Sequence, residues 1–283
     1  MKMEIVYGVK IDPPTKEIAR AFNSNEEPVL LKGGQGTSYR SGDIVLKPWE
    51  GEKDDWMPEV FKDLPESSEV RFARPVKSIE GKWKYKDYIA WEYLPGEHIY
   101  GQYYDKKISA SIAFHKLFKD VPKPDFIGIS RNSWSVGDLV AWQKLEFNYD
   151  KDFMELYDQI KPNLKEIDVA YQLIHGDLSG NFLLDPSLPP AIIDFSPAWA
   201  PNGFAEGIML TDSISWENAT PDDLKAFDVI PNIDQFAWRG VLRRITEQAE
   251  HIKWFNKDKN QALKEAKVFQ KAIDFLQLKY GKK

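Results

Sequence analysis

The pattern of hydrophobic and polar positions divides the chain into two parts. Between residues 28 and 93, short apolar runs alternate with glycine and polar residues, which is typical of strands and tight turns. Beyond residue 95, apolar side chains recur every three or four positions, as on one face of a helix. The expected strands are 28–48 (a meander of about three), 71–77 and 87–93, and the expected helices are 14–22, 54–64, 104–119, 136–146, 151–164, 204–216, 232–248 and 260–278.

One β-rich island, residues 172–194, interrupts the helical part. It is expected to form strand, loop, strand, tight turn and strand, and therefore a small hairpin. We thus expect an α+β protein with an N-terminal part at 1–93, a hinge at 94–97 and a mainly helical C-terminal part at 98–283.

Composition removes several classes of protein. The 283 residues leave room for two domains, and 42% hydrophobic residues are enough for a large core. The formal net charge of −6 argues against a nucleic-acid or anionic-membrane partner. Cysteine is absent, which excludes disulfides, thiolate zinc sites and a cysteine nucleophile. Without a long apolar run or a signal-like start, the expected location is the cytoplasm.

The sharpest local signal is the run His175-Gly176-Asp177-Leu178-Ser179-Gly180-Asn181, followed after a second strand and a turn by Asp194. Loops at neighbouring strand ends would bring the oxygens of Asp177, Asn181 and Asp194 together. Such hard oxygen ligands suit Mg²⁺, which commonly takes one or two carboxylates and keeps water and phosphate for the rest. One carboxylate would remain to act as a base.

A glycine-rich loop precedes this region in the N-terminal part. Gly33, Gly34 and Gly36 are followed by Ser38, and Lys47 lies on the next strand. Glycines let backbone N–H groups approach a phosphate closely, and the lysine could reach the same phosphates. The loop lacks the Gly-Lys-Ser/Thr ending of a Walker motif, so that class of nucleotide hydrolase is disfavoured.

Taken in order, the glycine loop, strand lysine, HGD, asparagine and Asp-Phe resemble the aminoglycoside phosphotransferase and choline kinase superfamily of protein-kinase-like enzymes. The resemblance covers most of the chain and implies a bilobal fold with the active site between the lobes. It also implies ATP and Mg²⁺ as cofactors and a small-molecule acceptor.

The resemblance also assigns roles to residues. Lys47 would pair with the nucleotide phosphates, and Glu59, with Glu66 as its rival, would orient Lys47. Asp177 would be the catalytic base and Asn181 and Asp194 the Mg²⁺ ligands. The adenine would be held by the linker 94–97, with Leu94 and the strand-end Glu92.

Two supporting residues are expected around the catalytic loop. His175 is expected to brace the loop through hydrogen bonds to backbone rather than to transfer protons. Asp212 lies in an apolar helical setting, which indicates a buried carboxylate bonded to the catalytic-loop backbone.

One departure from the superfamily pattern bears on activity. The usual spacing is HGDxxxxN, whereas only Leu178, Ser179 and Gly180 separate Asp177 from Asn181. The expected function is phosphoryl transfer from ATP to a hydroxyl of a small molecule. The shortened loop keeps open a nucleotide-binding scaffold with little or no transfer activity. A protein-Ser/Thr kinase is disfavoured because no activation-segment signature follows Phe195.

Overall fold

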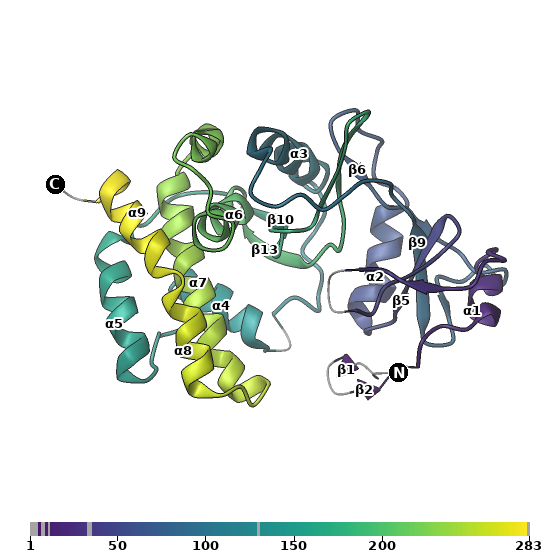
Figure 1. Ribbon diagram of the computed structural model, residues 1–283, viewed down its shortest axis with the longest axis horizontal. Helices are drawn as coiled ribbons and strands as arrows, with labels where there is room; N and C mark the ends of the chain where they lie inside the picture. The colour runs from purple at the N-terminus through teal and green to yellow at the C-terminus, as the bar shows by residue number, and fades with distance from the viewer. Residues whose placement is uncertain (1–4, 7–8, 11, 33–35, 129–130, 282–283) are drawn as a thin grey trace. The chain divides into compact units, whose positions relative to one another are not determined.

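The computed structural model describes residues 5–6, 9–10, 12–32, 36–128 and 131–281. The chain divides into two compact units, Met1–Gly96 and Glu97–Lys283, which Figure 1 shows as a strand-rich and a helix-rich part. The α+β class expected from the sequence is confirmed. The division falls inside the range 94–97 that the sequence marks as a hinge.

The first unit contains an antiparallel sheet in the order β3-β4-β5-β9-β7, with β8 also paired to β9. The separate strands β1 and β2 pair with each other. Its elements are β1 (Ile5–Val6), β2 (Val9–Lys10), α1 (Lys16–Ala21), β3 (Val29–Leu30), β4 (Tyr39–Ser41), β5 (Ile44–Pro48), α2 (Glu52–Phe61), β6 (Arg71–Phe72), β7 (Pro75–Val76), β8 (Lys84–Tyr85) and β9 (Tyr88–Glu92).

The central strand β9 is covered on both faces, which explains its continuous apolar run. Ile18 and Phe22, in and just beyond α1, belong to one hydrophobic cluster with Leu46 and Ala90. Successive side chains of a strand point to opposite faces, so Trp91 lies on the other face. There the ring of Phe61, at the end of α2, meets Trp91 edge-on at 5.5 Å. The two helices therefore cover opposite faces of the sheet, as Figure 1 also shows.

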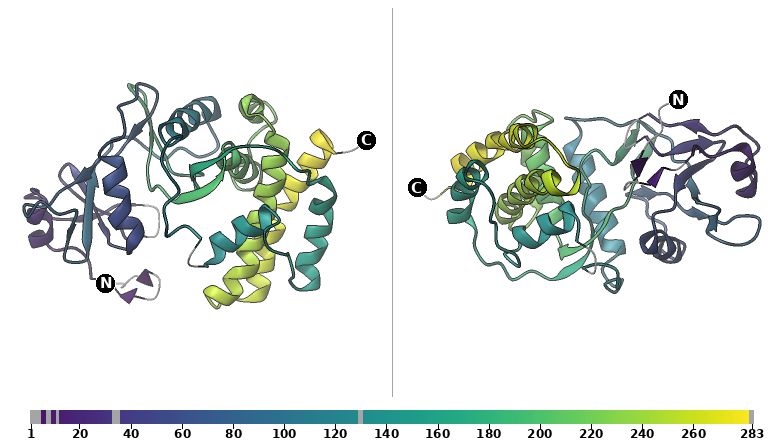
Figure 2. Two further views of the ribbon diagram at one scale, coloured as in Figure 1. Left: turned by 180° about the vertical axis from the view of Figure 1, so that it is seen from behind. Right: turned by 90° about the horizontal axis from the view of Figure 1, so that it is seen from below.

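The second unit is built around α7, a helix of 22 residues that contacts α4, α5, α6, α8 and α9. Figure 2 shows this helix among the others from two further sides. The elements are α3 (Tyr104–Leu117), α4 (Ser133–Ala141), α5 (Lys151–Ile160), the 3₁₀ helix η1 (Lys161–Asn163), β10 (Tyr171–His175), β11 (Phe182–Asp185), β12 (Leu188–Ile192), β13 (Pro197–Pro201), α6 (Phe204–Ser215), the 3₁₀ helix η2 (Asp223–Val229), α7 (Ile233–Trp254), α8 (Lys259–Lys267) and α9 (Gln270–Tyr280). In the described part of the chain, no helix has the length and apolar character to cross a membrane.

Three local expectations differ from the structure. The single helix expected at 260–278 is two helices, because tight i to i−3 bonds from Val268 and Phe269 break the α-helical ladder. Pro189 and Pro190 lie within β12 instead of forming a turn, and the register between β11 and β12 shifts there, as expected where proline cannot donate a ladder bond. Strand β13, which pairs with β10, was not expected.

Close packing of α6 against α7 depends on glycine. A Cβ placed on Gly207 would lie 2.5 Å from the carbonyl carbon of Phe236 and 2.7 Å from its oxygen. A Cβ on Gly240 would lie 2.9 Å from the carbonyl oxygen of Gly207. The two helix backbones therefore approach each other at a distance that no larger residue permits.

We expect Gly207→Ala to lower the free energy of unfolding by about 2 kcal/mol, because overpacking against backbone outweighs the helix propensity that alanine adds. Gly137→Ala is the matched control, since its nearest neighbours would lie at 3.2 Å and two of its three are side-chain atoms. The control should lose at most about 1 kcal/mol. Urea unfolding measures both, and equal losses would contradict this account of the α6–α7 contact.

Candidate active site

The HGD run lies where β10 ends. β10 pairs with β13 from Tyr171 opposite Pro201 to His175 opposite Pro197. The pairing continues one step further, because Gly176 N–H donates to the carbonyl oxygen of Ser196 (2.7 Å). Strand pairing therefore places the loop that begins at Gly176 beside the segment that follows Asp194.

Ile193 ties the two halves of the site together. Its N–H donates to the carbonyl oxygen of Asn181 (3.0 Å), and its own carbonyl oxygen accepts from Nε2 of His175 (3.1 Å). Nδ1 of His175 in turn accepts the N–H of Asp177 (3.2 Å). Asp177, Asn181 and Asp194, which are separated in sequence, are thus held close together by backbone bonds.

His175 must be neutral to make both bonds. Its Nδ1 accepts a hydrogen bond while its Nε2 donates one, which is a single neutral tautomer of the imidazole. The side chain is fully buried, and burial lowers the pKa of His175 to about 4. These contacts are those of a brace between two loops, as the sequence led us to expect.

A second buried polar layer lies behind His175. Its backbone N–H donates to Nε2 of His115 (3.0 Å), and Nδ1 of His115 donates to Oε1 of Glu206 (3.0 Å), which also accepts from the hydroxyl of Ser111. Burial opposes ionisation of Glu206, but the electrostatic effect of His115, together with the bonds from His115 and Ser111, outweighs it and lowers the pKa of this carboxyl. Nothing in the sequence analysis indicated this layer.

Asp194 has a backbone conformation that few non-glycine residues adopt, with φ of 55°. The next residue, Phe195, stacks on Phe118 at 4.9 Å and meets His175 edge-on at 5.5 Å. This aromatic anchor holds the strained position in place. Such strain at a residue singled out for chemistry is typical of functional sites.

Asn181 has one half of its amide occupied. Its Nδ2 donates to the carbonyl oxygen of Asp177 (2.6 Å), so Oδ1 is the end left to face a ligand. The carboxylate of Asp194 and this amide oxygen are hard donors that fit Mg²⁺. Over the described ranges, no group of three or more His, Asp or Glu side chains is arranged to hold a metal ion.

The side chain of Asp177 is 47% exposed. Its Oδ1 accepts from Nη2 of Arg244 at 3.1 Å. Arg244 lies on α7, and nothing in the local sequence indicated it. Asp177 can therefore receive a substrate proton while one of its oxygens is held by a cation.

Asp212 is buried as expected, but its partner differs from the one expected. Its two oxygens accept from Nε (3.0 Å) and Nη2 (2.6 Å) of Arg244. The expected bond to the catalytic-loop backbone is replaced by a guanidinium that reaches Asp177. The physical reason is that a buried carboxylate is better compensated by a positive charge than by backbone donors.

The residues expected around Lys47 lie on or near α2 in the first unit. Ile44 and Leu46 lie on the face of β5 that α1 covers. Lys47 lies on the opposite face, which α2 covers. Glu59 is engaged elsewhere: Oε2 pairs with Lys62 and Oε1 accepts from Trp83, each at 2.5 Å. Both oxygens of the expected partner of Lys47 are thus committed to other residues.

The rival of Glu59 is also paired with another residue. Glu66 pairs with Arg74 at 2.7 Å. Burial raises the pKa of Asp54 in α2, and the positive charges of Lys53 and Lys47 partly offset that rise. Asp54, which sequence reasoning did not consider, is thus influenced by the charge of Lys47, and its Oδ2 accepts the backbone N–H of Glu50 (2.6 Å).

Of the residues that were expected to contact the nucleotide, the structure describes those of the linker and only part of the glycine loop. Gly33 and Gly34 lie outside the described residues, whereas Gly36 has a positive φ of 72° that suits glycine. The carbonyl of Ser38 accepts from Leu31 N–H (2.9 Å). The carboxylate of Glu92 accepts from Arg74 N–H (3.3 Å), and Leu94 is partly buried. Their contact with adenine or phosphate stays a prediction.

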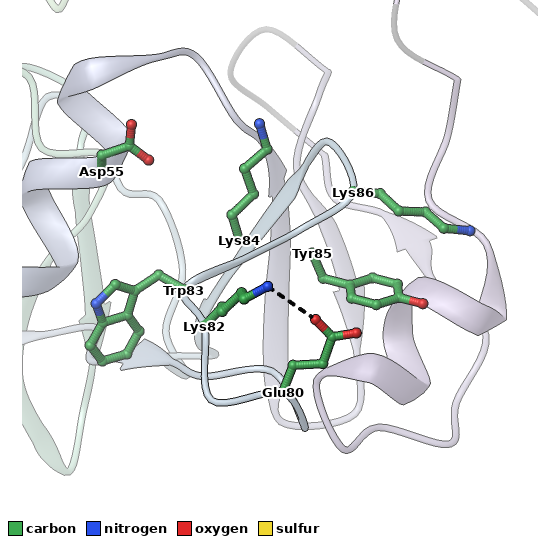
Figure 3. A pocket seen from close by; sticks show the side chains of 7 residues that line it. All are labelled: Asp55, Glu80, Lys82, Trp83, Lys84, Tyr85 and Lys86. Carbon is green, nitrogen blue, oxygen red and sulfur yellow. Dashed lines mark ion pairs between the residues drawn. The ribbon is translucent and has the colours of Figure 1, made fainter.

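A separate shallow pocket of about 600 Å³ lies on the β8–β9 side of the first unit. Figure 3 shows alternating lysine and aromatic side chains along its wall, with Lys82 paired to Glu80 at 3.6 Å. Asp55 closes its other side. It contains none of the residues that the sequence singled out for chemistry.

The fold is similar to that of several solved phosphotransferases and kinases. No family model and no curated protein matches the chain. Among solved structures, it is similar to an aminoglycoside phosphotransferase from Alicyclobacillus acidocaldarius (TM-score 0.60, 16% identity, covering 96% of this chain and 98% of the other). It is also similar to a thermostable mutant of aminoglycoside phosphotransferase APH(4)-Ia (0.60, 14%, 95% and 100%). A choline kinase from Streptococcus pneumoniae follows (0.55, 13%, 93% and 97%). The protein-kinase-like fold implied by the motif order is therefore confirmed.

We expect the His175 brace to give the protein a specific pH dependence. Because the folded pKa of about 4 lies below the ordinary 6.5, the unfolded chain takes up the proton first as the pH falls. Stability is therefore full above pH 6.5 and declines toward pH 4. Between pH 7 and pH 5 the free energy of unfolding should fall by about 2 kcal/mol more in the native protein than in His175→Gln. Parallel urea titrations at the two pH values measure this, and equal slopes would refute the neutral brace.

Proposed function

We propose that this chain is an ATP- and Mg²⁺-dependent phosphotransferase that transfers the γ-phosphoryl group to a hydroxyl of a small molecule. The observation that carries the proposal is that hydrogen bonds of Ile193 and His175 join the segments that contain Asp177, Asn181 and Asp194. Phosphoryl transfer needs a base or orienting carboxylate beside metal-binding oxygens, and little covalent chemistry from the protein.

The structural neighbours support the choice of substrates. A spectinomycin phosphotransferase similar to this chain (TM-score 0.56, 15% identity) was solved with ADP and spectinomycin. An amicoumacin kinase (0.58, 14%) was solved with AMP-PNP, Ca²⁺ and its antibiotic. Both pair a nucleotide with a small-molecule acceptor. At these identities the acceptor itself does not carry over, so the proposal extends to the reaction and not to a particular compound.

Asp177 acts on the acceptor. Its carboxylate is half exposed and so can accept a hydrogen bond from the incoming hydroxyl. As the new O–P bond forms and the bond to ADP breaks, the hydroxyl proton passes to Asp177. The transition state is loose, so an ordinary carboxylate that positions the hydroxyl and takes its proton late is sufficient.

Asp194 and Asn181 hold the metal. Their oxygens would bind Mg²⁺, which would neutralise charge on the nucleotide phosphates. The positive φ of Asp194 and the bond from Asn181 Nδ2 to Asp177 O fix both donors in advance. Pre-set donors lose little freedom when the metal binds.

Lys47, with Asp54 as the nearby acid of α2, is proposed to bind the nucleotide phosphates. The proposal rests on the place of Lys47 on the α2 face of β5. Gly36 and Ser38 belong to the loop proposed to cover those phosphates.

The alternative is a scaffold that binds nucleotide without transfer. It draws on the shortened loop and on the guanidinium that occupies Oδ1 of Asp177. The two proposals differ in turnover and agree in nucleotide binding. A panel of amino alcohols, sugars and aminoglycosides, assayed for acceptor-dependent ADP release, separates them.

We expect Asp177→Asn to reduce kcat by about 10²- to 10⁴-fold, because the amide cannot accept the hydroxyl proton. ATP affinity should change little, since the amide oxygen keeps the contact with Arg244. Steady-state assays with the acceptor found in the panel and ATP titration calorimetry measure the two effects. Asp158→Asn, an exposed aspartate on α5, is the surface control. Unchanged turnover in Asp177→Asn would remove this residue from the mechanism.

A second prediction concerns the metal. Mg²⁺ should raise the thermal stability that ATP confers on the native protein, and Asp194→Asn should abolish that increment because an amide is a much weaker ligand than a carboxylate. The measurement is a melting curve with ATP, with and without Mg²⁺. An increment that survives in the variant would place the metal elsewhere.

A further inference from the structure

Five charged side chains form a cluster beneath the HGD loop in the second unit. They come from three helices: Asp138 on α4, Asp212 on α6, and Arg243, Arg244 and Glu247 on α7. All but Asp138 are largely buried. Together with Asp177, the cluster holds two positive and four negative formal charges. Each arginine therefore forms ion pairs with more than one carboxylate.

Arg244 is fixed at all three of its nitrogens. Nε and Nη2 bind Asp212 in a bidentate pair (3.0 and 2.6 Å), and Nη1 binds Oε2 of Glu247 (3.0 Å). A bidentate pair fixes the plane of a guanidinium as well as its position. The remaining contact of Nη2, to Oδ1 of Asp177 at 3.1 Å, is therefore made from a rigid support.

Exposure changes sharply along this chain of contacts. The side chain of Arg244 is 13% exposed and that of Asp212 is 7% exposed, whereas that of Asp177 is 47% exposed. Burial lowers the pKa of Arg244, but Asp212, Glu247 and Asp177 outweigh it and raise this pKa well above its ordinary value. A permanent buried cation thus holds one oxygen of a carboxylate whose other end faces solvent.

Arg243 makes a different set of contacts in the same cluster. Its Nε donates to Asp138 (2.6 Å), and its Nη1 lies 2.7 Å from Oε1 of Glu247 as an ion pair without hydrogen-bond geometry. The two adjacent arginines share Glu247, and only the bonds of Arg244 include Asp177. Substituting Arg243 therefore tests the stability of the cluster alone, whereas substituting Arg244 also removes the contact with Asp177.

We propose that Arg244 is the positioning residue of Asp177, holding Oδ1 so that Oδ2 is presented to the acceptor hydroxyl. The existence of an acceptor hydroxyl rests on the proposed function. The fixed orientation of Asp177 does not, because it is a property of the protein alone. Without the guanidinium, the half-exposed carboxylate would sample several rotamers, and only a fraction of them would meet the hydroxyl.

The test compares Arg244→Gln and Arg244→Lys with Arg243→Gln, after melting curves establish which variants fold. The first readout needs no substrate: three-bond couplings of the Asp177 side chain, in protein labelled at aspartate and assigned with Asp177→Asn. We expect one χ1 rotamer in the native protein and in Arg243→Gln, and averaged couplings in both Arg244 variants. A single rotamer in a folded Arg244 variant would overturn the proposal. Lysine keeps the charge without the fork, so Arg244→Lys remains informative if glutamine prevents folding.

The second readout uses the acceptor from the panel. Arg244→Gln should lower kcat by roughly 100-fold with little change in KM, and added guanidinium should restore part of kcat. Arg243→Gln should lose stability without gaining any rescue. If Arg244→Gln folds but guanidinium does not restore any of its kcat, Arg244 has only a structural role. A native protein that lacks turnover but shows averaging in the Arg244 variants would refute the proposed function and leave the positioning of Asp177 supported.

Discussion

The site depends on one buried imidazole that joins two loops. His175 accepts the N–H of Asp177 at Nδ1 and donates to the carbonyl of Ile193 at Nε2. Only a neutral ring can do both, and burial enforces that state, since an unpaired charge in this apolar setting would be costly. Asp177 and Asp194 belong to different loops, yet each is within two residues of a bond to this ring. The strands deliver the two loops to the same place, and the imidazole fixes their separation.

Backbone and side chains have different tasks around this brace. Backbone bonds from Gly176 to Ser196 and from Ile193 to Asn181 set where the three site residues lie. The buried ions on α6 and α7 set how one of them is oriented, through Arg244. The helices that contribute these ions, α6 and α7, are in close backbone contact at Gly207. Preorganised donors and carboxylates of this kind are what phosphoryl transfer asks of a protein, because its transition state is stabilised by position and charge.

The sequence predicted what is local in the chain and missed what is brought together by folding. The HGD loop and Asp194 carry their signal within about twenty residues, and the expected class and most helices follow from periodicity. Arg244 comes from α7, 67 positions beyond Asp177, and no spacing rule connects the two. Glu59 and its rival Glu66 are engaged by Lys62, Trp83 and Arg74, and no local pattern indicated these contacts. Strand β13 was not predicted because the alternation in Pro-Ala-Trp-Ala-Pro is too short and too proline-rich to indicate a strand.

The most direct measurement of the central claim is a crystal structure of the protein with a non-hydrolysable ATP analogue and Mg²⁺. We expect a metal at about 2.0–2.1 Å from a carboxylate oxygen of Asp194 and from Oδ1 of Asn181. We also expect the γ-phosphate on that metal and Oδ2 of Asp177 open toward it. A metal bound by other residues, or a nucleotide whose γ-phosphate lies away from Asp177, would contradict the proposed site.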